Sequence, residues 1–302
     1  MSPDAFARWL DERRRLVETA LEQHLTAPPA CPAVVLDAMR YSLLGGGKRL
    51  RPLLVLASAE AVASLSGRSP DEARALALPA ACAVEMIHTY SLIHDDLPAM
   101  DDDTLRRGRP TLHVAYGEGM AILAGDGLHA EAFLVLARAP DSDDPAVAAR
   151  KLRVIRLVGE AAGPAGMVGG QALDLQAVAD GATPLDATRL EDMHARKTGA
   201  LIRASAEAGA VMAGADDETT RAVTRYATAI GLAFQIVDDI LDVEGSAEEL
   251  GKSAGKDAAS GKLTRSRELA AECADRARAA LDAVGLHGHL PAIVEWTLTR
   301  QR

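Results

Sequence analysis

The chain has 302 residues, of which 48% are hydrophobic and only 3% aromatic, and its net charge is −10. This length allows one large domain or two ordinary ones, and no linker-like segment divides it. Strands favour β-branched and aromatic residues, so the Ala-rich, aromatic-poor composition favours helices. The acidic balance argues against a general nucleic-acid binder, which would present a basic surface.

Cysteine usage and hydropathy predict the cellular compartment of the protein. Three widely spaced cysteines, Cys31, Cys82 and Cys273, predict neither a disulfide framework nor a zinc site. The polar, charged segment 1–13 does not resemble a signal peptide. No stretch reaches the ~18 uninterrupted apolar residues that a membrane span needs. We therefore expect a cytoplasmic protein without a membrane span.

Capping residues, prolines and apolar periodicity predict helices along the whole chain. Ser2 and Pro3 start the first helix, the glycines at 45–47 stop the second, and Pro98 ends a long apolar helix. The predicted helices cover residues 3–25, 33–44, 52–64, 71–97, 119–137, 145–162, 167–179, 185–213, 218–243, 258–284 and 290–302. No segment alternates with period two. The sequence predicts one all-α domain over residues 1–302, a bundle of about a dozen helices.

Two aspartate clusters, at residues 95–101 and 238–242, each follow an apolar, helix-patterned run. Carboxylates at the ends of apolar helices are costly unless a cation neutralises them. In the second cluster, Asp238 and Asp242 share one helical face. The alternative interpretation is a solvated acidic helix face. Two such clusters far apart in the sequence favour a shared acidic cavity that binds divalent cations.

The first cluster needs a break in its helix before it can bind one ion. Asp95 and Asp101 are six residues apart, about 120° from a common face of a straight helix. Pro98 removes a helical hydrogen bond and clashes with the preceding turn, so we expect the chain to fold Asp101 back toward Asp95. Carboxylates without His or Cys partners suit Mg²⁺ or Mn²⁺ better than zinc.

Basic groups lie before, between and after the acidic clusters. They comprise residues 45–52 (Gly-Gly-Gly-Lys-Arg-Leu-Arg-Pro), Arg106, Arg107 and Arg109, residues 197–199 (Lys-Thr-Gly), and Lys252, Lys256 and Lys262. Taken singly, each is commonly a solvated surface or a helix end. Glycines let the backbone approach an anion and the cations supply charge, so the alternation of acidic and basic groups suits diphosphates bridged by metal ions. The Walker pattern GxxxxGK[ST] is absent.

An ordered set of motifs resembles the trans-polyprenyl diphosphate synthases. The motifs are GGKRLRP at 46–52, SLIHDDLPAMD at 91–101, LRRG at 105–108, GGQALD at 169–174, KTG at 197–199 and FQIVDDILD at 234–242. The similarity covers nearly the whole chain and is strongest to the bacterial short-chain branch. It implies the all-α isoprenoid synthase fold, a homodimer, and condensation of isopentenyl diphosphate with an allylic diphosphate (dimethylallyl, then geranyl) with the help of three Mg²⁺ ions.

The resemblance also implies a role for each matching residue. The implied metal ligands and their neighbours are Asp95, Asp96, Asp101, Asp238, Asp239 and Asp242. The allylic diphosphate would be held by Arg106, Lys197, Lys252 and Lys262. Isopentenyl diphosphate would be held by Lys48, Arg51, His88 and Arg107. Thr198 and Gln235 would line the reacting carbons, with Lys197 beside them, and the leaving diphosphate would accept the final proton.

Product length should depend on what closes the pocket below Asp95. In the resembling family an aromatic residue at the position of Tyr90 accompanies a C15 product, farnesyl diphosphate, and smaller residues accompany C20. The helical wheel places Tyr90 about 140° from Asp95 and Ser91 about 40° from it. The C15 expectation therefore rests on the resemblance, and C20 or C10 products remain alternatives.

Two further functions remain open on sequence grounds. A terpene cyclase also ionises diphosphates, but two Asp-rich motifs and few aromatics disfavour it. A non-catalytic partner subunit of a prenyl transferase is the other alternative, because the family commonly continues with Thr-Tyr-Pro after Gly261-Lys262, whereas this chain reads Leu263-Thr264-Arg265. This departure puts the role of Lys262 in doubt.

Overall fold

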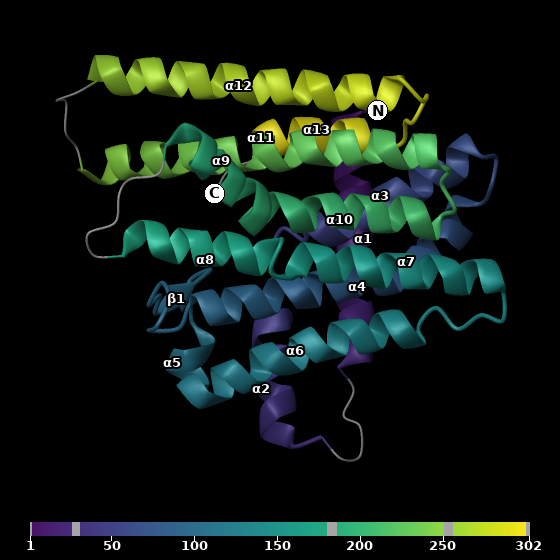
Figure 1. Cartoon of the computed structure of the whole chain (residues 1–302), viewed down its shortest axis with the longest axis horizontal. Coiled ribbons are helices and arrows are strands. Elements are labelled where there is room, and N and C mark those ends of the chain that lie inside the picture. Colours follow the sequence, from purple (N-terminus) through teal and green to yellow (C-terminus); the bar gives the residue numbers. More distant parts are fainter. Residues whose placement is uncertain (1, 26–30, 180–185, 251–255, 300–302) are drawn as a thin grey trace.

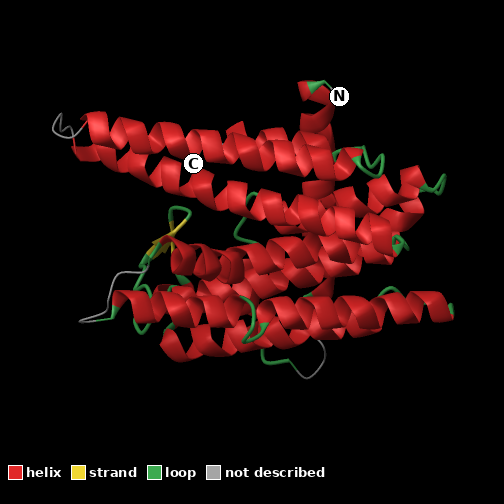
Figure 2. Ribbon diagram, turned by 45° about the horizontal axis from the view of Figure 1, so that its top comes forward, coloured by secondary structure: helices red, strands yellow, loops and turns green. Residues whose placement is uncertain are grey.

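A computed structural model shows the molecule as an all-helical bundle, with its long helices packed side by side (Figures 1 and 2). It describes residues 2–25, 31–179, 186–250 and 256–299, with the backbone alone at 187, 242, 244–250 and 256–262. The elements are α1 (Pro3–His24), α2 (Ala33–Leu43), α3 (Leu50–Leu65), α4 (Pro70–Asp95), β1 (Leu105–Arg106), β2 (Arg109–Pro110), α5 (Leu112–Tyr116), α6 (Glu118–Arg138), α7 (Pro145–Ala162), α8 (Met167–Val178), α9 (Ala187–His194), the π-helical turn η1 (Ala195–Gly199), α10 (Ala200–Met212), α11 (Asp217–Leu250), α12 (Lys256–Asp282) and α13 (Leu290–Thr299).

These elements confirm the predicted all-α class. Two short features were not predicted: the two-residue strands β1 and β2, and the five-residue helix α5. The predicted helix over 185–213 is interrupted at η1, and α11 extends beyond the predicted end at residue 243. Neither a π-turn nor a two-residue strand has a periodicity that a sequence window can detect.

The core is built around α3, α4 and α10. These helices are apolar on nearly all sides, as expected of helices surrounded by protein. Gly209 of α10 lies against α3 so closely that a β-carbon there would be 1.9 Å from the Val55 carbonyl oxygen. By length and composition α4 and α6 could each cross a membrane; the apolar window of α4 is 72% buried inside the protein and that of α6 only 39%.

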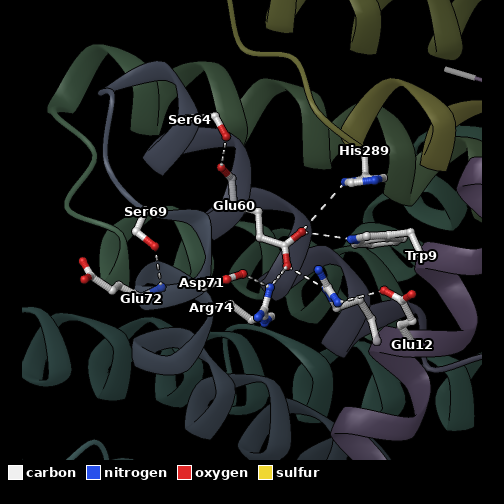
Figure 3. Close-up of polar contacts among 10 residues, drawn as sticks. Trp9, Glu12, Glu60, Ser64, Ser69, Asp71, Glu72, Arg74 and His289 are labelled. Atoms are coloured by element: carbon white, nitrogen blue, oxygen red, sulfur yellow. Dashed lines mark hydrogen bonds and ion pairs between the residues drawn. The ribbon is translucent and has the colours of Figure 1, made fainter.

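A buried carboxylate joins both ends of the chain to this core. The Glu60 side chain of α3 accepts hydrogen bonds from the Trp9 indole (2.9 Å) and the Arg13 guanidinium (2.7 Å), both on α1 (Figure 3). Arg74 of α4 lies 3.4 Å from the same carboxylate. His289, just before α13, lies 3.8 Å from it and stacks on Trp9 at 4.3 Å. Glu60 therefore connects four segments that are distant in sequence.

Glu60→Gln is expected to lower the free energy of unfolding by about 1–3 kcal/mol, because the buried indole and guanidinium lose a charged acceptor. Urea unfolding followed by circular dichroism would measure the change. Glu12→Gln is the matched control, since Glu12 is exposed and lies 3.5 Å from Arg13. That control should cost less than about 1 kcal/mol. Equal effects of the two substitutions would contradict the role assigned to Glu60.

Candidate active site

A cavity of about 370 Å³ opens beside the C-terminal half of α4. One wall comes from α4 and the turn after it, a second from α8, and the rest from α3 and η1. The lining residues are Arg51, His88, Tyr90, Ser91, Leu92, His94, Asp95, Met100, Met167, Val168, Gln171, Ala172, Leu175, Lys197 and Thr198. Charged groups and apolar side chains thus line one open cavity, as in many ligand sites.

The predicted break after α4 is confirmed. The helix ends at Asp95, and the following turn brings the Asp101 amide to within 2.8 Å of the Asp95 carbonyl oxygen. Burial raises the pKa of Asp95 to about 6, opposed by the positive charge of Lys197 and reinforced by the negative charge of Asp101. The two carboxylates are therefore neighbours that destabilise each other unless a cation lies between them.

Lys197 faces this carboxylate pair from the π-turn. Its Nζ donates a 2.5 Å hydrogen bond to Oδ2 of Asp174 on α8, and its charge also acts on Asp95. Thr198, the next residue, lines the same cavity. A π-turn within a helix is commonly found at functional sites. Here it presents an ammonium group and a hydroxyl group side by side to the cavity.

Two glycines hold the π-turn in place. A β-carbon on Gly170 of α8 would lie 2.2 Å from the Lys197 backbone nitrogen. A β-carbon on Gly231 of α11 would lie 3.3 Å from the Gly199 α-carbon. The turn is therefore packed directly against the backbones of α8 and α11, which fixes where the Lys197 and Thr198 side chains begin.

The first arginine after the acidic cluster is paired within the protein. Arg106 donates from Nε to Oδ1 of Asp96 at 2.7 Å, and Asp96 is only 4% exposed. Asp96 is thus engaged by Arg106, while Asp95 and Asp101 remain next to each other. Arg106 keeps partial exposure and also acts electrostatically on Asp95.

A tight hairpin positions the arginines that follow. Arg107 (φ 54°) and Gly108 (φ 73°) occupy its two turn positions, as a type I′ turn requires. The Arg107 guanidinium donates to the Gly46 carbonyl oxygen and lies where a β-carbon on Gly47 would be. Arg109 lies over the Tyr41 ring at 4.4 Å. The glycine loop before α3 and the hairpin therefore form one basic surface.

The cationic side of the cavity is centred on His88. Burial and the charges of Arg51, Arg107, Arg106 and Arg49 lower its pKa well below the ordinary value, so the imidazole is neutral at pH 7. Arg51 is 8% exposed, its Nε has no hydrogen-bond partner in the described part of the chain, and burial lowers its pKa to about 10. A buried guanidinium with an unused donor indicates an anion site. Lys48 lies in the loop before α3 and is half-buried.

Arg49 is a structural neighbour of this anion site. It is 3% exposed and donates from Nη1 to Glu85 of α4 at 2.7 Å and from Nη2 to the Leu43 carbonyl at 2.8 Å. The basic motif before α3 is therefore divided between two tasks, because Arg49 forms a buried ion pair and Arg51 faces the cavity.

The second acidic cluster lies on α11 at the same end of the bundle as the hairpin and the end of α4 (Figure 1). The charge of Asp238 acts on Arg51, which lines the cavity together with Asp95. This electrostatic effect connects Asp238 to the cavity through Arg51. Asp239 is exposed. Lys252 lies outside the described residues, and the side chains of Asp242 and Lys262 are likewise not described.

Gln235 is not placed as the sequence analysis expected. Its amide nitrogen donates to Oδ1 of Asp239 at 3.0 Å, and its side chain lines a separate pocket of about 100 Å³ with His194 and Arg203. Residues 235 and 239 are four apart on α11 and share a face, which is turned toward α9 and η1. Of the predicted pair, Thr198 alone lines the main cavity in this structure.

Tyr90 and Ser91 both line the cavity, although the helical wheel favoured Ser91 alone. The wheel gives only the direction of the β-carbon, and a tyrosine ring reaches well beyond it. Tyr90 is 8% exposed, and its ring stacks on His129 of α6 at 4.6 Å and meets His94 edge-on at 5.7 Å. The ring therefore stands between the cavity and α6.

The donor set of this site fits Mg²⁺ or Mn²⁺. Within the described residues, no three His, Cys, Asp or Glu side chains converge into a complete metal cage. Mg²⁺ does not need one, since it commonly takes one or two carboxylates and completes its coordination with water and substrate phosphates. The adjacent carboxylates of Asp95 and Asp101, with the pKa of Asp95 raised, provide that partial set.

A carboxylate pair that fits Mg²⁺, a buried arginine and a largely apolar cavity together suit an all-helical enzyme that acts on diphosphates. The polyprenyl synthetase family model matches residues 32–289, and the chain belongs to this family. It is 48% identical over 257 residues to farnesyl diphosphate synthase of Geobacillus stearothermophilus (85% of this chain, 82% of the relative). It is 46% identical over 256 residues to geranylgeranyl diphosphate synthase of Cyanophora paradoxa (85% and 80%).

Solved structures give the same result for the fold. The apo FPP/GFPP synthase of Zymomonas mobilis superposes with a TM-score of 0.81 at 35% identity, covering 98% of both chains. A geranyltransferase of Legionella pneumophila superposes with a TM-score of 0.80 at 32% identity, covering 99% of this chain and 98% of that one. The protein is a short-chain trans-prenyl diphosphate synthase with the isoprenoid synthase fold, as the sequence analysis expected.

Sequence reasoning gave no role to the α8 residues that line the cavity. Met167, Gln171 and Leu175 recur every fourth residue and form one face of the helix. Asp174, which pairs with Lys197, lies beside them. For Gln171 and Asp174 the signal was present in the motif GGQALD at 169–174, but the motif alone does not show which of its side chains line the cavity.

Proposed function

We propose that this enzyme condenses isopentenyl diphosphate head to tail with dimethylallyl and then geranyl diphosphate, and that farnesyl diphosphate (C15) is its main product. The observation that supports it best is the cavity itself. Its ionic end contains Asp95, Lys197 and Arg51, and its remaining wall is mostly apolar and bounded by Tyr90. This combination suits a substrate with a diphosphate head and a short hydrocarbon tail.

The allylic diphosphate would lie at the ionic end. Asp95, Asp101 and Asp238 would hold Mg²⁺, and bound Mg²⁺ supplies positive charge that stabilises a departing diphosphate. Lys197 and Arg106 would bind the same group. When the allylic C1–O bond breaks, the electron pair leaves with the diphosphate and the prenyl carbon becomes cationic. The apolar wall excludes water that would otherwise capture this cation.

Isopentenyl diphosphate would occupy the basic side. Arg51 and Arg107 would bind its diphosphate, and neutral His88 can donate a hydrogen bond to it without adding a charge. The double bond of isopentenyl diphosphate then forms the new carbon–carbon bond to the allylic C1. The proton lost in re-forming a double bond passes to an oxygen of the released diphosphate, which is the only base this proposal requires.

One assay tests the proposal directly. Purified protein is incubated with Mg²⁺, isopentenyl diphosphate and each allylic starter, and the dephosphorylated products are sized by chromatography. A C15 alcohol is the expected result. A C20 product would match the geranylgeranyl diphosphate synthases among its relatives. A C10 product would mean that a residue closer to the ionic end than Tyr90 stops chain growth. Either product would refute the C15 assignment. No product from any starter would favour a non-catalytic partner subunit.

Tyr90→Ala is expected to shift the main product from C15 to C20 or longer. The ring stands between the cavity and α6, so its removal extends the space available to the hydrocarbon tail. Product sizing by chromatography measures the shift. Tyr116→Ala, on α5 outside the cavity, is the matched control and should leave the product unchanged. A C15 product from the Tyr90→Ala variant would show that Tyr90 does not set chain length.

The proposed enzyme is also a homodimer, with α6 at its interface. The apolar window of α6 is only 39% buried, and its exposed side chains include Ile122, Leu123 and Leu134. Leu123 and Leu134 lie about 20° apart on the helical wheel and so share a face. Analytical ultracentrifugation of the wild type should give a dimer, and Leu123→Glu should shift it toward monomer. A wild-type monomer would contradict this part of the proposal.

A further inference from the structure

Gln171 is the one polar side chain in the stripe of α8 that faces the cavity. Met167 precedes it by four residues and Leu175 follows it by four, so the amide sits in the middle of an otherwise apolar stripe. Both polar atoms of the amide are buried, and neither has a hydrogen-bond partner among the residues that the structure describes. A buried amide without partners loses free energy relative to an apolar residue of the same shape. The protein therefore carries an uncompensated polar group at this position.

The position of Gln171 is fixed by its helical neighbours. Gly170 packs against the backbone of Lys197, and Asp174 bonds the Lys197 ammonium. Asp174 marks the ionic end of the cavity, and Gln171 is three residues away, about 4.5 Å along the helix axis. The amide therefore lies about one helical turn from the ionic end, where the diphosphate would be held. At that depth in the cavity it would be beside the first carbons of the prenyl group.

A neutral prenyl group offers this amide no partner. While the tail is intact, the amide faces hydrocarbon and its hydrogen-bonding capacity remains unused. Once the C1–O bond breaks, the same carbons carry positive charge and the amide oxygen dipole becomes favourable. A group that gains its interaction only as the bond breaks stabilises the transition state more than the bound substrate, and such differential binding raises kcat.

We propose that Gln171 is a catalytic residue whose amide oxygen faces the developing allylic cation, in the cavity lined by Asp95, Lys197 and Thr198. This inference rests on the proposed function. The amide takes no proton and forms no bond; it acts as a fixed dipole against C1 to C3 of the prenyl group. The alternative is that the side chain only fills space in the wall of the cavity, in which case removing the amide should leave catalysis intact.

The test uses Gln171→Met, which keeps the length of the side chain and removes the amide. We expect kcat to fall by about 10²-fold, the KM values for both substrates to change little, and the thermal midpoint to stay equal to or above that of the wild type. Gln176→Met, the same change at an exposed position on α8, is the matched control and should leave kcat unchanged. Gln171→Asn, which keeps the amide but withdraws it by one methylene, should also lose most of kcat.

Binding of two analogues separates a catalytic role from a structural one. An allylic thiolodiphosphate does not ionise and should bind wild type and Gln171→Met equally. The same skeleton with a protonated amine at the cationic carbon should bind the variant roughly tenfold more weakly. Calorimetric titration in the presence of Mg²⁺ gives both constants.

The possible failures are distinguishable. If wild type makes prenyl products and Gln171→Met matches its kcat, the inference is wrong while the proposed function stands. Equal losses for both analogues, or a fall in kcat that follows a fall in the thermal midpoint, would assign Gln171 a structural role instead. If wild type makes no product from any starter, the proposed function itself fails.

Discussion

Asp95→Asn is expected to lower kcat/KM by roughly 10²–10³-fold or more, because it removes a charge that would hold the metal against the departing diphosphate. The substitution keeps the shape of the side chain, and burial raises the pKa of Asp95 to about 6, so the ionised form is disfavoured in the folded protein. Activity should therefore be lost while the thermal midpoint of the metal-free protein stays equal or rises. Steady-state kinetics at saturating Mg²⁺ and thermal unfolding in a chelator measure the two quantities.

The sign of this stability effect follows from proton linkage. Between pH 3.8 and about 6 the folded state holds more protons at Asp95 than the unfolded state, so this group makes stability fall as the pH rises through that window. The Asn variant should lose that component of the pH dependence. Asp102→Asn is the matched control in the same turn, where asparagine accepts the left-handed backbone (φ 54°). Full activity of Asp95→Asn, or an equal loss in Asp102→Asn, would contradict the assignment.

Arg49→Ala is expected to destabilise the fold by about 3–5 kcal/mol, because it leaves the Glu85 carboxylate buried without its partner. The side chains of Arg49 and Glu85 are 1% and 3% exposed and lie 2.7 Å apart. Urea unfolding gives the change in free energy. Arg156→Ala, which breaks an exposed pair with Glu160 at 3.9 Å, serves as the control and should cost less than about 1 kcal/mol.

A double substitution separates the contribution of the ion pair to stability from that of side-chain packing at the same place. Arg49→Met with Glu85→Leu removes both charges and fills similar volumes, so it should recover most of the stability lost by Arg49→Ala. If the single variant unfolds at the same urea concentration as wild type, the pair does not hold α3 and α4 together. Because Arg49 also acts on His88, the pKa of His88 should rise when that charge is removed.

Much of the fold was predictable because each helix has its own signals in the sequence. Ser2 caps α1, Ser69 caps α4, and α7 runs from Pro145 to Ala162 as predicted. The return of Asp101 toward Asp95 was also predictable, since Pro98 cannot continue a helix. These features depend on the local chain alone, which is why a single sequence shows them.

The parts that could not be predicted depend on contacts between distant segments. The place of Gln235 depends on how α11 turns against α9 and η1, and the helical wheel has no information on that rotation. The wheel likewise missed that the ring of Tyr90 reaches the cavity. The π-turn at Ala195–Gly199 needs the close approach of Gly170 and Gly231, which the sequence does not reveal.

The type I′ hairpin at residues 105–110 has a consequence for how such enzymes diversify. Its arginines are positioned by a turn and by the glycine loop, whereas the apolar part of the cavity is lined mainly by side chains on α4 and α8. Substitutions at the apolar positions of those two helices can reshape the hydrocarbon space without disturbing the loops that would hold the head group. Selection for a new product can therefore proceed one apolar residue at a time, while His88, Asp95 and Gln171 stay in place.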